Sequence, residues 1–326
     1  MDVAFYEVFE EEKRALKQFL PAGIKAAFYS QTTQEKTGSA PPAPFISIRT
    51  HSKIPVHWSP HLKAVLTRSQ GFDHLVTFRK AAGFEGSLGH LSNYCARAVA
   101  EHVLMSLMAL WRKLDAQQNQ FRSFKRDGLT GRQLADKKAC VIGIGNIGSE
   151  IVELLKSVRM KVKGVDILKR SKRLEYVTLK EGVKWADVLV IAAALTPKTK
   201  RLLTYNILKD VKPGCTLINI ARGEIAPIQD LKKLLDKGVL GAIALDIYEG
   251  EAELAGALRK GKRSATPAVQ AVLALKGREN VLLTPHNAFN TKEALEEKAR
   301  RTVEGIQAFL KRGKFPHEVP INNLVA

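Results

Sequence analysis

Short, continuous apolar runs alternate with amphipathic stretches through the middle of the chain. Helical patterns, such as those at 147–159 and 227–237, separate most of these runs. Continuous apolar strands that alternate with helices are typical of a doubly wound parallel sheet, because helices cover both faces of such a sheet. The predicted strands lie at 139–143, 162–166, 188–193, 216–220, 241–245 and 281–284.

The two ends of the chain carry a different pattern. Before about residue 93, residues 26–29, 45–48 and 64–67 are predicted as buried strands of a further parallel sheet. Near the other end, apolar residues recur at helical spacing from about 291 to 311, and Gly313 follows. This last segment therefore predicts a long amphipathic helix.

One predicted helix, at 97–113, is apolar on more than one side. Val99, Val103 and Leu107 repeat at helical spacing, while Met105 and Met108 widen the apolar surface. A surface helix needs only one apolar stripe. We therefore expect this helix to lie in a domain core, or to line a subunit interface as well.

The composition indicates a globular protein of two domains. At 326 residues the chain exceeds the size at which one core stops growing, and 45% of its residues are hydrophobic. No run approaches the roughly 18 apolar residues that a membrane span needs, and acidic residues near the N-terminus argue against a secretory signal. Cys95, Cys140 and Cys215 form no CxxC pair, so free thiols are expected. We expect a cytoplasmic protein without a metal site or a membrane partner.

The formal net charge of the chain is +20. A strongly basic surface can bind nucleic acid, attract small anions or keep a protein in solution. The charge is spread along the whole chain, and no helix-turn-helix, zinc-finger or RNA-binding motif accompanies it. A solvated or anion-attracting surface is therefore favoured over a nucleic-acid partner.

A glycine fingerprint follows the first strand of the middle segment. Gly143, Gly145 and Gly148 have the GxGxxG spacing of a dinucleotide-binding turn. In such a turn the first glycine permits a tight bend, the second lets the backbone approach a pyrophosphate, and the third lets the helix pack on the sheet. Asp166 ends the second strand, where a carboxylate accepts hydrogen bonds from ribose hydroxyls and repels a 2′-phosphate. The sequence therefore predicts NAD as the cofactor in preference to NADP.

Three residues with anion-binding or acid–base chemistry each follow a later predicted strand. They are Arg222, Glu251 and His286. The planar fork of an arginine matches a carboxylate, and a carboxylate orients an imidazole and favours the imidazolium that donates a proton. Because carboxyl ends of parallel strands face the ligand crevice, this order predicts a nicotinamide-dependent dehydrogenase with an anionic substrate.

These motifs carry a family resemblance that covers nearly the whole chain. The chain resembles the D-isomer-specific 2-hydroxyacid dehydrogenases, and most closely their D-lactate dehydrogenase branch. The matching stretches are 46–55, 68–74, 98–102, the glycine fingerprint, 195–199, 219–223, 246–251 and 284–289.

The resemblance implies roles for the catalytic residues. Arg222 would bind the substrate carboxylate and polarise the keto oxygen. His286 would exchange a proton with that oxygen, and Glu251, rather than its neighbour Glu249, would hydrogen-bond His286. The implied cofactor contacts are Gly143, Gly145, Asn146, Ile147, Gly148, Asp166, Thr196, Pro197, Ala221 and Asp246.

The resemblance also implies substrate contacts outside the middle segment. Backbone amides near Gln70 and Gly71 would bind the substrate carboxylate, and Arg49 would add a second anchor. Tyr94 would either face the substrate or support the junction between the domains.

The implied fold is α/β, with two doubly wound parallel-sheet domains. The NAD-binding domain, 94–290, would be inserted into a substrate domain made of 1–93 and 291–326. A homodimer is also implied. The stretch 252–279 is basic and irregular in its pattern, so we expect a loop there.

The favoured function is the reversible, NAD-dependent reduction of a small anionic 2-keto acid to the D-2-hydroxy acid, with pyruvate as the first candidate. An aromatic or branched 2-keto acid is the rival substrate, because loops set the size of the pocket. The alternative class is a non-enzymatic, NAD(H)-sensing regulatory protein. The C-terminal-binding-protein group of corepressors shares the fold, and such proteins can keep the same catalytic set.

Overall fold

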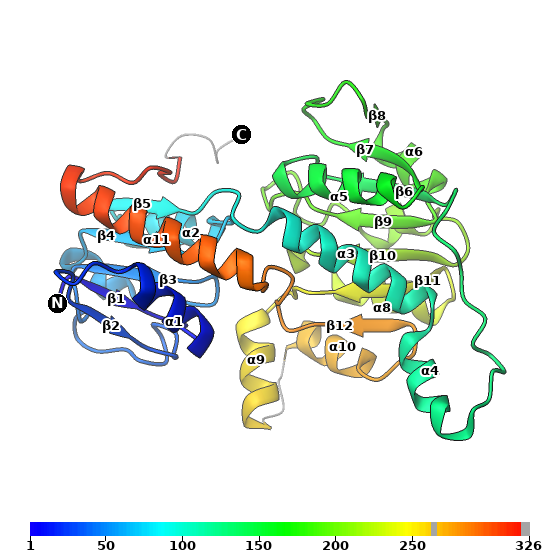
Figure 1. Cartoon of the computed structure of the whole chain (residues 1–326), viewed down its shortest axis with the longest axis horizontal. Coiled ribbons are helices and arrows are strands. Elements are labelled where there is room, and N and C mark those ends of the chain that lie inside the picture. Colours follow the sequence, from blue (N-terminus) through cyan, green and yellow to red (C-terminus); the bar gives the residue numbers. More distant parts are fainter. Residues whose placement is uncertain (262–265, 321–326) are drawn as a thin grey trace. The chain divides into compact units, whose positions relative to one another are not determined.

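The computed structural model describes residues 1–261 and 266–320 of the chain, which form two compact units (Figure 1). Residues 1–95, together with those from 290 onward, form the split unit. Residues 96–289 form the inserted unit. Each unit is built on a parallel sheet with helices on both faces, so the predicted α/β class is confirmed.

The split unit has a five-stranded sheet in the order β2-β1-β3-β4-β5, and every pair of neighbouring strands is parallel. The strands are β1 (Val3–Phe5), β2 (Ala26–Phe28), β3 (Phe45–Ile48), β4 (Ala64–Thr67) and β5 (Ser87–His90). The helices are α1 (Glu10–Phe19), the 3-10 helix η1 (Val56–His61), α2 (Asp73–Ala82) and α11 (Lys292–Arg312).

Successive strand residues of the split unit bury their side chains on opposite faces of the sheet, as the pleat requires. On one face Phe5 and Leu66 pack in a cluster with residues of α1 and α11. On the other face Ile46 and Val65 pack with residues of η1 and α2. The first and last parts of the chain therefore share one core.

The inserted unit has a seven-stranded parallel sheet in the order β12-β11-β10-β9-β6-β7-β8. The strand order reverses between β6 and β9, and ligands of doubly wound sheets bind at the carboxyl ends beside such a switch point. The strands are β6 (Lys138–Ile142), β7 (Lys161–Val165), β8 (Glu175–Tyr176), β9 (Val188–Ile191), β10 (Cys215–Asn219), β11 (Leu240–Leu245) and β12 (Val281–Leu283).

Helices cover both faces of this second sheet (Figure 1). One face packs against α3 and α5, and the other packs against α6, α8 and α10. The helices are α3 (Ala96–Trp111), α4 (Leu114–Gln120), η2 (Phe121–Ser123), α5 (Asn146–Ser157), α6 (Leu179–Trp185), α7 (Tyr205–Leu208), η3 (Gly223–Ile225), α8 (Ile228–Asp236), α9 (Glu251–Lys260) and α10 (Pro267–Leu275).

Helix α3 is buried on one side only within the chain. Val103 and Leu107 are fully buried against α5 and the sheet, whereas Met105 and Met108 stay 49% and 43% exposed. The apolar residues therefore supply both a core face and an exposed apolar face.

The expectation of a loop over 252–279 is wrong for most of that stretch. Helix α9 occupies its first part and α10 its second, while 262–265 lie outside the described residues. Pro267 stands at the first position of α10, where a missing amide costs nothing, and the apolar residues that follow pack into the core. Among the described helices, none is long and apolar enough to cross a membrane.

Candidate active site

The glycine turn joins β6 to α5 at the carboxyl edge of the inserted sheet. Gly143 has a φ of 94°, and a Cβ there would lie 2.5 Å from backbone atoms of Ala193. A Cβ on Gly148 would lie 1.9 Å from the Gly143 carbonyl oxygen, so neither position accepts a side chain. Nothing lies within 4 Å of a Cβ on Gly145, the N-cap of α5. The turn is therefore tight where it bends and open where a pyrophosphate would approach the helix N-terminus.

Asp166 follows β7 and faces the glycine turn. Its Oδ2 accepts a hydrogen bond from the Ile144 amide at 2.6 Å, and its Oδ1 accepts one from the Leu168 amide at 2.8 Å. Each carboxylate oxygen has a second lone pair, which can accept from a ribose hydroxyl. The glycines and this carboxylate together fit a dinucleotide with an unphosphorylated ribose.

The other predicted cofactor contacts lie after the carboxyl ends of three neighbouring strands. Asn146 and Ile147 open α5, Thr196 and Pro197 follow β9, and Ala221 follows β10. They border the same edge of the sheet as the glycine turn.

Arg222 lies in a short turn that is fixed by Asn219, the last residue of β10. The Asn219 Nδ2 donates to the Arg222 carbonyl oxygen at 2.9 Å, and its Oδ1 accepts from the Ala221 amide at 3.0 Å. A Cβ on Gly223 would lie 2.1 Å from the Glu249 nitrogen, so the turn packs closely on the segment that follows β11. The half-buried guanidinium is thereby held at the strand ends.

His286 and Glu251 form a close pair at the same edge. The His286 Nδ1 lies 2.6 Å from the Glu251 Oε1, and the two side chains are 20% and 19% exposed. Because a carboxylate only accepts, the Nδ1–H donates to it, and Nε2 is the nitrogen through which the ring can exchange a proton with a ligand. Glu251 is the first residue of α9, after β11, while His286 follows β12.

Asp246 anchors the turn that carries His286. Its Oδ1 accepts from the Thr284 hydroxyl at 2.6 Å and the Asn287 amide at 2.8 Å, and its Oδ2 accepts from the Ala288 amide at 2.9 Å. His286 has a φ of 53°, a left-handed conformation that few side chains adopt. The buried carboxylate thus stabilises a strained turn, a role that the sequence analysis did not foresee for Asp246.

His102 on α3 supports the same turn, and the sequence analysis gave it no role. Its Nε2 lies 3.2 Å from the Thr284 hydroxyl and 3.8 Å from the Asp246 Oδ1. Burial lowers the pKa of His102, against the attraction of Asp246. The stretch 98–102 was noted only as a family match, and no local signal predicts a contact across 182 residues.

In the split unit, Glu7 organises the loop that carries Arg49. Its carboxylate accepts from the Arg49 amide at 3.0 Å, the His51 amide at 3.1 Å and the Ser52 amide at 2.9 Å. The Arg49 guanidinium lies 5.6 Å from the centre of the Phe9 ring. Glu7 was also absent from the sequence analysis. Its φ of 56° lies in the left-handed region, a constrained backbone conformation that the sequence does not reveal.

Gln70, Gly71 and Tyr94 follow the carboxyl ends of β4 and β5 in the split unit. The Ser69 hydroxyl donates to the Gly71 carbonyl at 2.7 Å and fixes the loop. Among the described residues, the buried Gln70 Oε1 has no hydrogen-bond partner, so the loop holds polar capacity that a ligand can use. Burial raises the pKa of Tyr94 well above its ordinary value, which keeps the phenol neutral.

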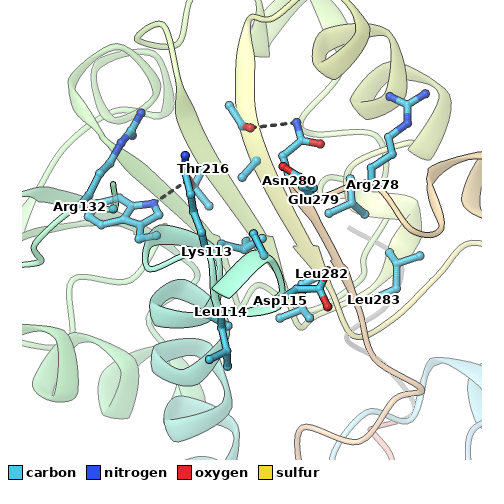
Figure 2. Close-up of a pocket in the computed structure, with 18 of the residues that line it drawn as sticks. Lys113, Leu114, Asp115, Arg132, Thr216, Arg278, Glu279, Asn280, Leu282 and Leu283 are labelled. Carbon is cyan, nitrogen blue, oxygen red and sulfur yellow. Dashed lines mark hydrogen bonds between the residues drawn. The ribbon is translucent and has the colours of Figure 1, made fainter. Parts of the chain in front are cut away.

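A cavity of about 570 Å³ lies elsewhere on the inserted unit (Figure 2). Its lining includes Gly214 and Thr216 at the start of β10 and Gly241 at the start of β11, together with Lys113 and Arg278. These positions are at the amino ends of the strands, opposite to the edge that carries His286. The cavity is therefore separate from the candidate site.

Comparison with known proteins agrees with the geometry. Residues 104–288 match the domain family described as "D-isomer specific 2-hydroxyacid dehydrogenase, NAD binding domain". The chain is 27% identical to the D-lactate dehydrogenase of Escherichia coli (strain K12), over 98% of this chain and 100% of that protein. It is 29% identical to an aromatic 2-oxoacid reductase of Clostridium sporogenes, over 77% of each.

A solved structure extends the likeness to the whole fold. The D-lactate dehydrogenase of Aquifex aeolicus, complexed with NAD and lactic acid, superposes with a TM-score of 0.84 at 28% identity, over 97% of this chain and 99% of that one. The chain therefore belongs to the D-isomer-specific 2-hydroxyacid dehydrogenase family, in its D-lactate dehydrogenase branch, and is an NAD-dependent enzyme.

Proposed function

We propose that this enzyme reversibly reduces a small 2-keto acid to the corresponding D-2-hydroxy acid, with His286 as the acid–base residue. The observation that carries the proposal is the 2.6 Å contact between the His286 Nδ1 and the Glu251 carboxylate. A carboxylate at Nδ1 fixes the ring orientation and stabilises the imidazolium. It leaves Nε2 to give a proton to the keto oxygen during reduction and to take it back during oxidation.

Arg222 binds the carboxylate of the substrate in this proposal and polarises the keto oxygen. Its backbone is fixed by Asn219, and a guanidinium presents two parallel donors to a carboxylate. Further anion contacts would come from the split unit, through the Gln70 and Gly71 amides and the Arg49 side chain. The uncharged phenol of Tyr94 would line the substrate site.

NAD, when bound, accepts or supplies the hydride. The glycine turn and the start of α5 would hold its pyrophosphate, and Asp166 would accept hydrogen bonds from the adenosine ribose. Asp246 contributes by holding the His286 turn in register with the strand ends, through the three hydrogen bonds that its carboxylate accepts.

Pyruvate is the first substrate candidate, because the named relatives include D-lactate dehydrogenases. A larger side chain is the second candidate, since one relative at 29% identity is an aromatic 2-oxoacid reductase. The two candidates differ in the size of the substrate side chain, and the loops around the site set how large a side chain can bind.

The test is turnover of NADH with a panel of 2-keto acids that runs from glyoxylate and pyruvate to phenylpyruvate, with chiral analysis of the product. We expect the D-isomer, and the ranking of kcat/KM along the panel reports the size of the pocket. Tight NADH binding without turnover of any panel member would overturn the proposal and favour an NAD(H)-sensing regulatory protein.

A further inference from the structure

One carboxylate of the split unit is buried among several cations. Glu12, on the first turn of α1, is 1% exposed, and the Arg68 Nε donates to its Oε1 at 3.0 Å. Arg68 is equally buried, and its remaining donors reach the Ser47 carbonyl at 2.8 Å and the Tyr6 carbonyl at 2.6 Å. This single arginine already neutralises Glu12 and satisfies its own donors, as a buried ion pair must.

A second buried cation shares the same carboxylate. Lys298 on α11 is 1% exposed, and its Nζ lies 2.5 Å from the Glu12 Oε1. The charged groups that act on Lys298 are Glu12 from α1, Arg68 after β4 and Arg49 after β3, with the thiol of Cys95 after β5. With Lys298 protonated, three cations face one carboxylate.

The excess of positive charge sets the protonation of both groups. Burial raises the pKa of Glu12, but Arg68, Lys298 and Arg49 outweigh burial and hold that pKa well below its ordinary value. Burial lowers the pKa of Lys298 from 10.5 to about 7, and the attraction of Glu12 offsets only part of this effect. Lys298 is therefore the member of this group that loses its proton near neutral pH.

The group lies beside the proposed anion contacts of the split unit. Arg68 stands two residues before Gln70 and three before Gly71, at the end of β4. Arg49 lies over Phe9, the N-cap of α1, and is close enough to shift the pKa values of Glu12 and Lys298. An anion bound at these contacts therefore enters the field of Lys298.

We propose that Lys298 is a positioning residue for the anionic substrate, whose buried ammonium strengthens binding of the substrate carboxylate and which gains its proton as that carboxylate arrives. It acts through the field at Arg49 and the Gln70 loop, without touching the substrate. This inference rests on the proposed function. Its consequence is that the affinity for the 2-keto acid weakens as pH rises through neutrality, for a reason independent of His286.

The test is the KM for the best 2-keto acid in the wild type, Lys298→Met and Lys298→Arg, from about pH 6 to about pH 9. Two unit charges separated by about 10 Å, at an effective dielectric constant of about 20–40, interact strongly enough to change binding roughly 4- to 17-fold. We expect Lys298→Met to raise KM by that factor at the acid end. The ratio to the wild type should fall toward one at the alkaline end, where the wild-type lysine has lost its proton.

Taking the ratio of KM values between variants cancels any pH dependence of the catalytic step, which all of them share. Lys298→Arg keeps a charge that does not titrate, so its KM should stay low at the alkaline end, where the wild-type KM has risen. Lys311→Met removes an exposed charge from the same helix and should leave KM unchanged at every pH. The urea unfolding transition, followed by circular dichroism, reports whether the split unit of each variant is folded, because NADH binds the inserted unit.

A ratio of KM values that does not change with pH would overturn the inference, and so would identical profiles for the Met and Arg variants. If one buried variant fails to fold, the other still decides, because each alone predicts a specific departure from the wild-type profile. Absence of turnover in the wild type would instead contradict the proposed function.

Discussion

At the scale of single residues, the imidazole of His286 is held by two separate acids. Glu251 contacts its Nδ1, while Asp246 accepts hydrogen bonds from the Thr284 hydroxyl before His286 and from the two backbone amides that follow it. One carboxylate thus orients the ring through its Nδ1, and the other holds the turn that carries it.

Replacement of His286 by alanine should lower turnover roughly 10²- to 10⁴-fold, the usual contribution of a positioned acid–base group. NADH binding should change little, because the glycine turn and Asp166 are untouched. Steady-state kinetics with NADH titration measures both. His317→Ala, an exposed histidine of the split unit, is the matched control, and near-wild-type turnover in His286→Ala would refute the assignment.

Replacement of Arg222 by lysine should raise the KM for the 2-keto acid roughly 10- to 100-fold, the value of a lost charge-assisted hydrogen bond. Lysine keeps the charge but cannot present two parallel donors. The comparison of KM with the dissociation constant for NADH separates substrate binding from cofactor binding. An unchanged KM would place the carboxylate anchor elsewhere.

Replacement of Asp166 by asparagine should narrow the preference for NADH over NADPH by roughly 10-fold, because the side chain no longer repels a 2′-phosphate. Asparagine keeps one oxygen that can accept from the Ile144 amide, so the glycine turn should survive. Initial rates with the two cofactors give the ratio. If it stays constant while the protein remains folded, cofactor selection lies outside this residue.

At the scale of helices and strands, the contact between α1 and α11 depends on how Glu12 is neutralised. Lys298→Met leaves Glu12 paired with Arg68 and removes the costly second cation, so the variant should be the more stable protein at pH 7. The folded-state pKa of Lys298, about 7, lies below its ordinary 10.5. Between these values the unfolded chain binds the extra proton, so wild-type stability should rise with pH by about 1.4 kcal/mol per unit relative to the variant.

Urea unfolding at about pH 7 and about pH 9 checks this prediction. The free energies of unfolding of the two proteins should converge as pH rises. Parallel pH profiles would show that Lys298 is not titrating in the folded state.

Six of the seven described strands of the inserted unit were predicted to within two residues, because their apolar runs are uninterrupted and both faces of the sheet are covered. In the split unit, β1 and β5 were missed. Strand β1 has only three residues, and the four residues of β5 include Gly89 and begin and end with polar side chains. Strand β8 has only two residues, too few for any periodicity. Helix α10 was missed because the charged residues around it suggested a loop.

The placement of candidate site residues was predictable where they follow a strand, since topology brings such positions to one edge. Arg222, Glu251 and His286 belong to this class. Glu7 and His102 do not, because their side chains bind backbone or hydroxyl groups 42 to 45 and 182 residues away. Contacts of that range depend on the packed fold and leave no local pattern.

At the scale of the whole molecule, the exposed apolar face of α3 favours association of two copies. Large exposed side chains such as Met105 and Met108 commonly mark an interface. We expect a homodimer by sedimentation equilibrium, and Met105→Glu with Met108→Glu should yield monomers. Ile207→Glu on α7, which is also exposed and apolar, should leave the dimer intact. A monomeric wild type would contradict the prediction.

The shared core of the split unit has a consequence for synthesis on the ribosome. Phe5 and Leu66 need Ala299 and Ile306 of α11 to cover their face of the sheet. The inserted unit, by contrast, contains all of its own strands and helices between residues 96 and 289. The nucleotide-binding unit can therefore fold as soon as residue 289 has been synthesised. The apolar face of the first sheet stays uncovered until α11 has been made. The exposed apolar face is most prone to aggregation during that interval, and loss of α11 would leave the first sheet uncovered in a chain whose cofactor unit is folded.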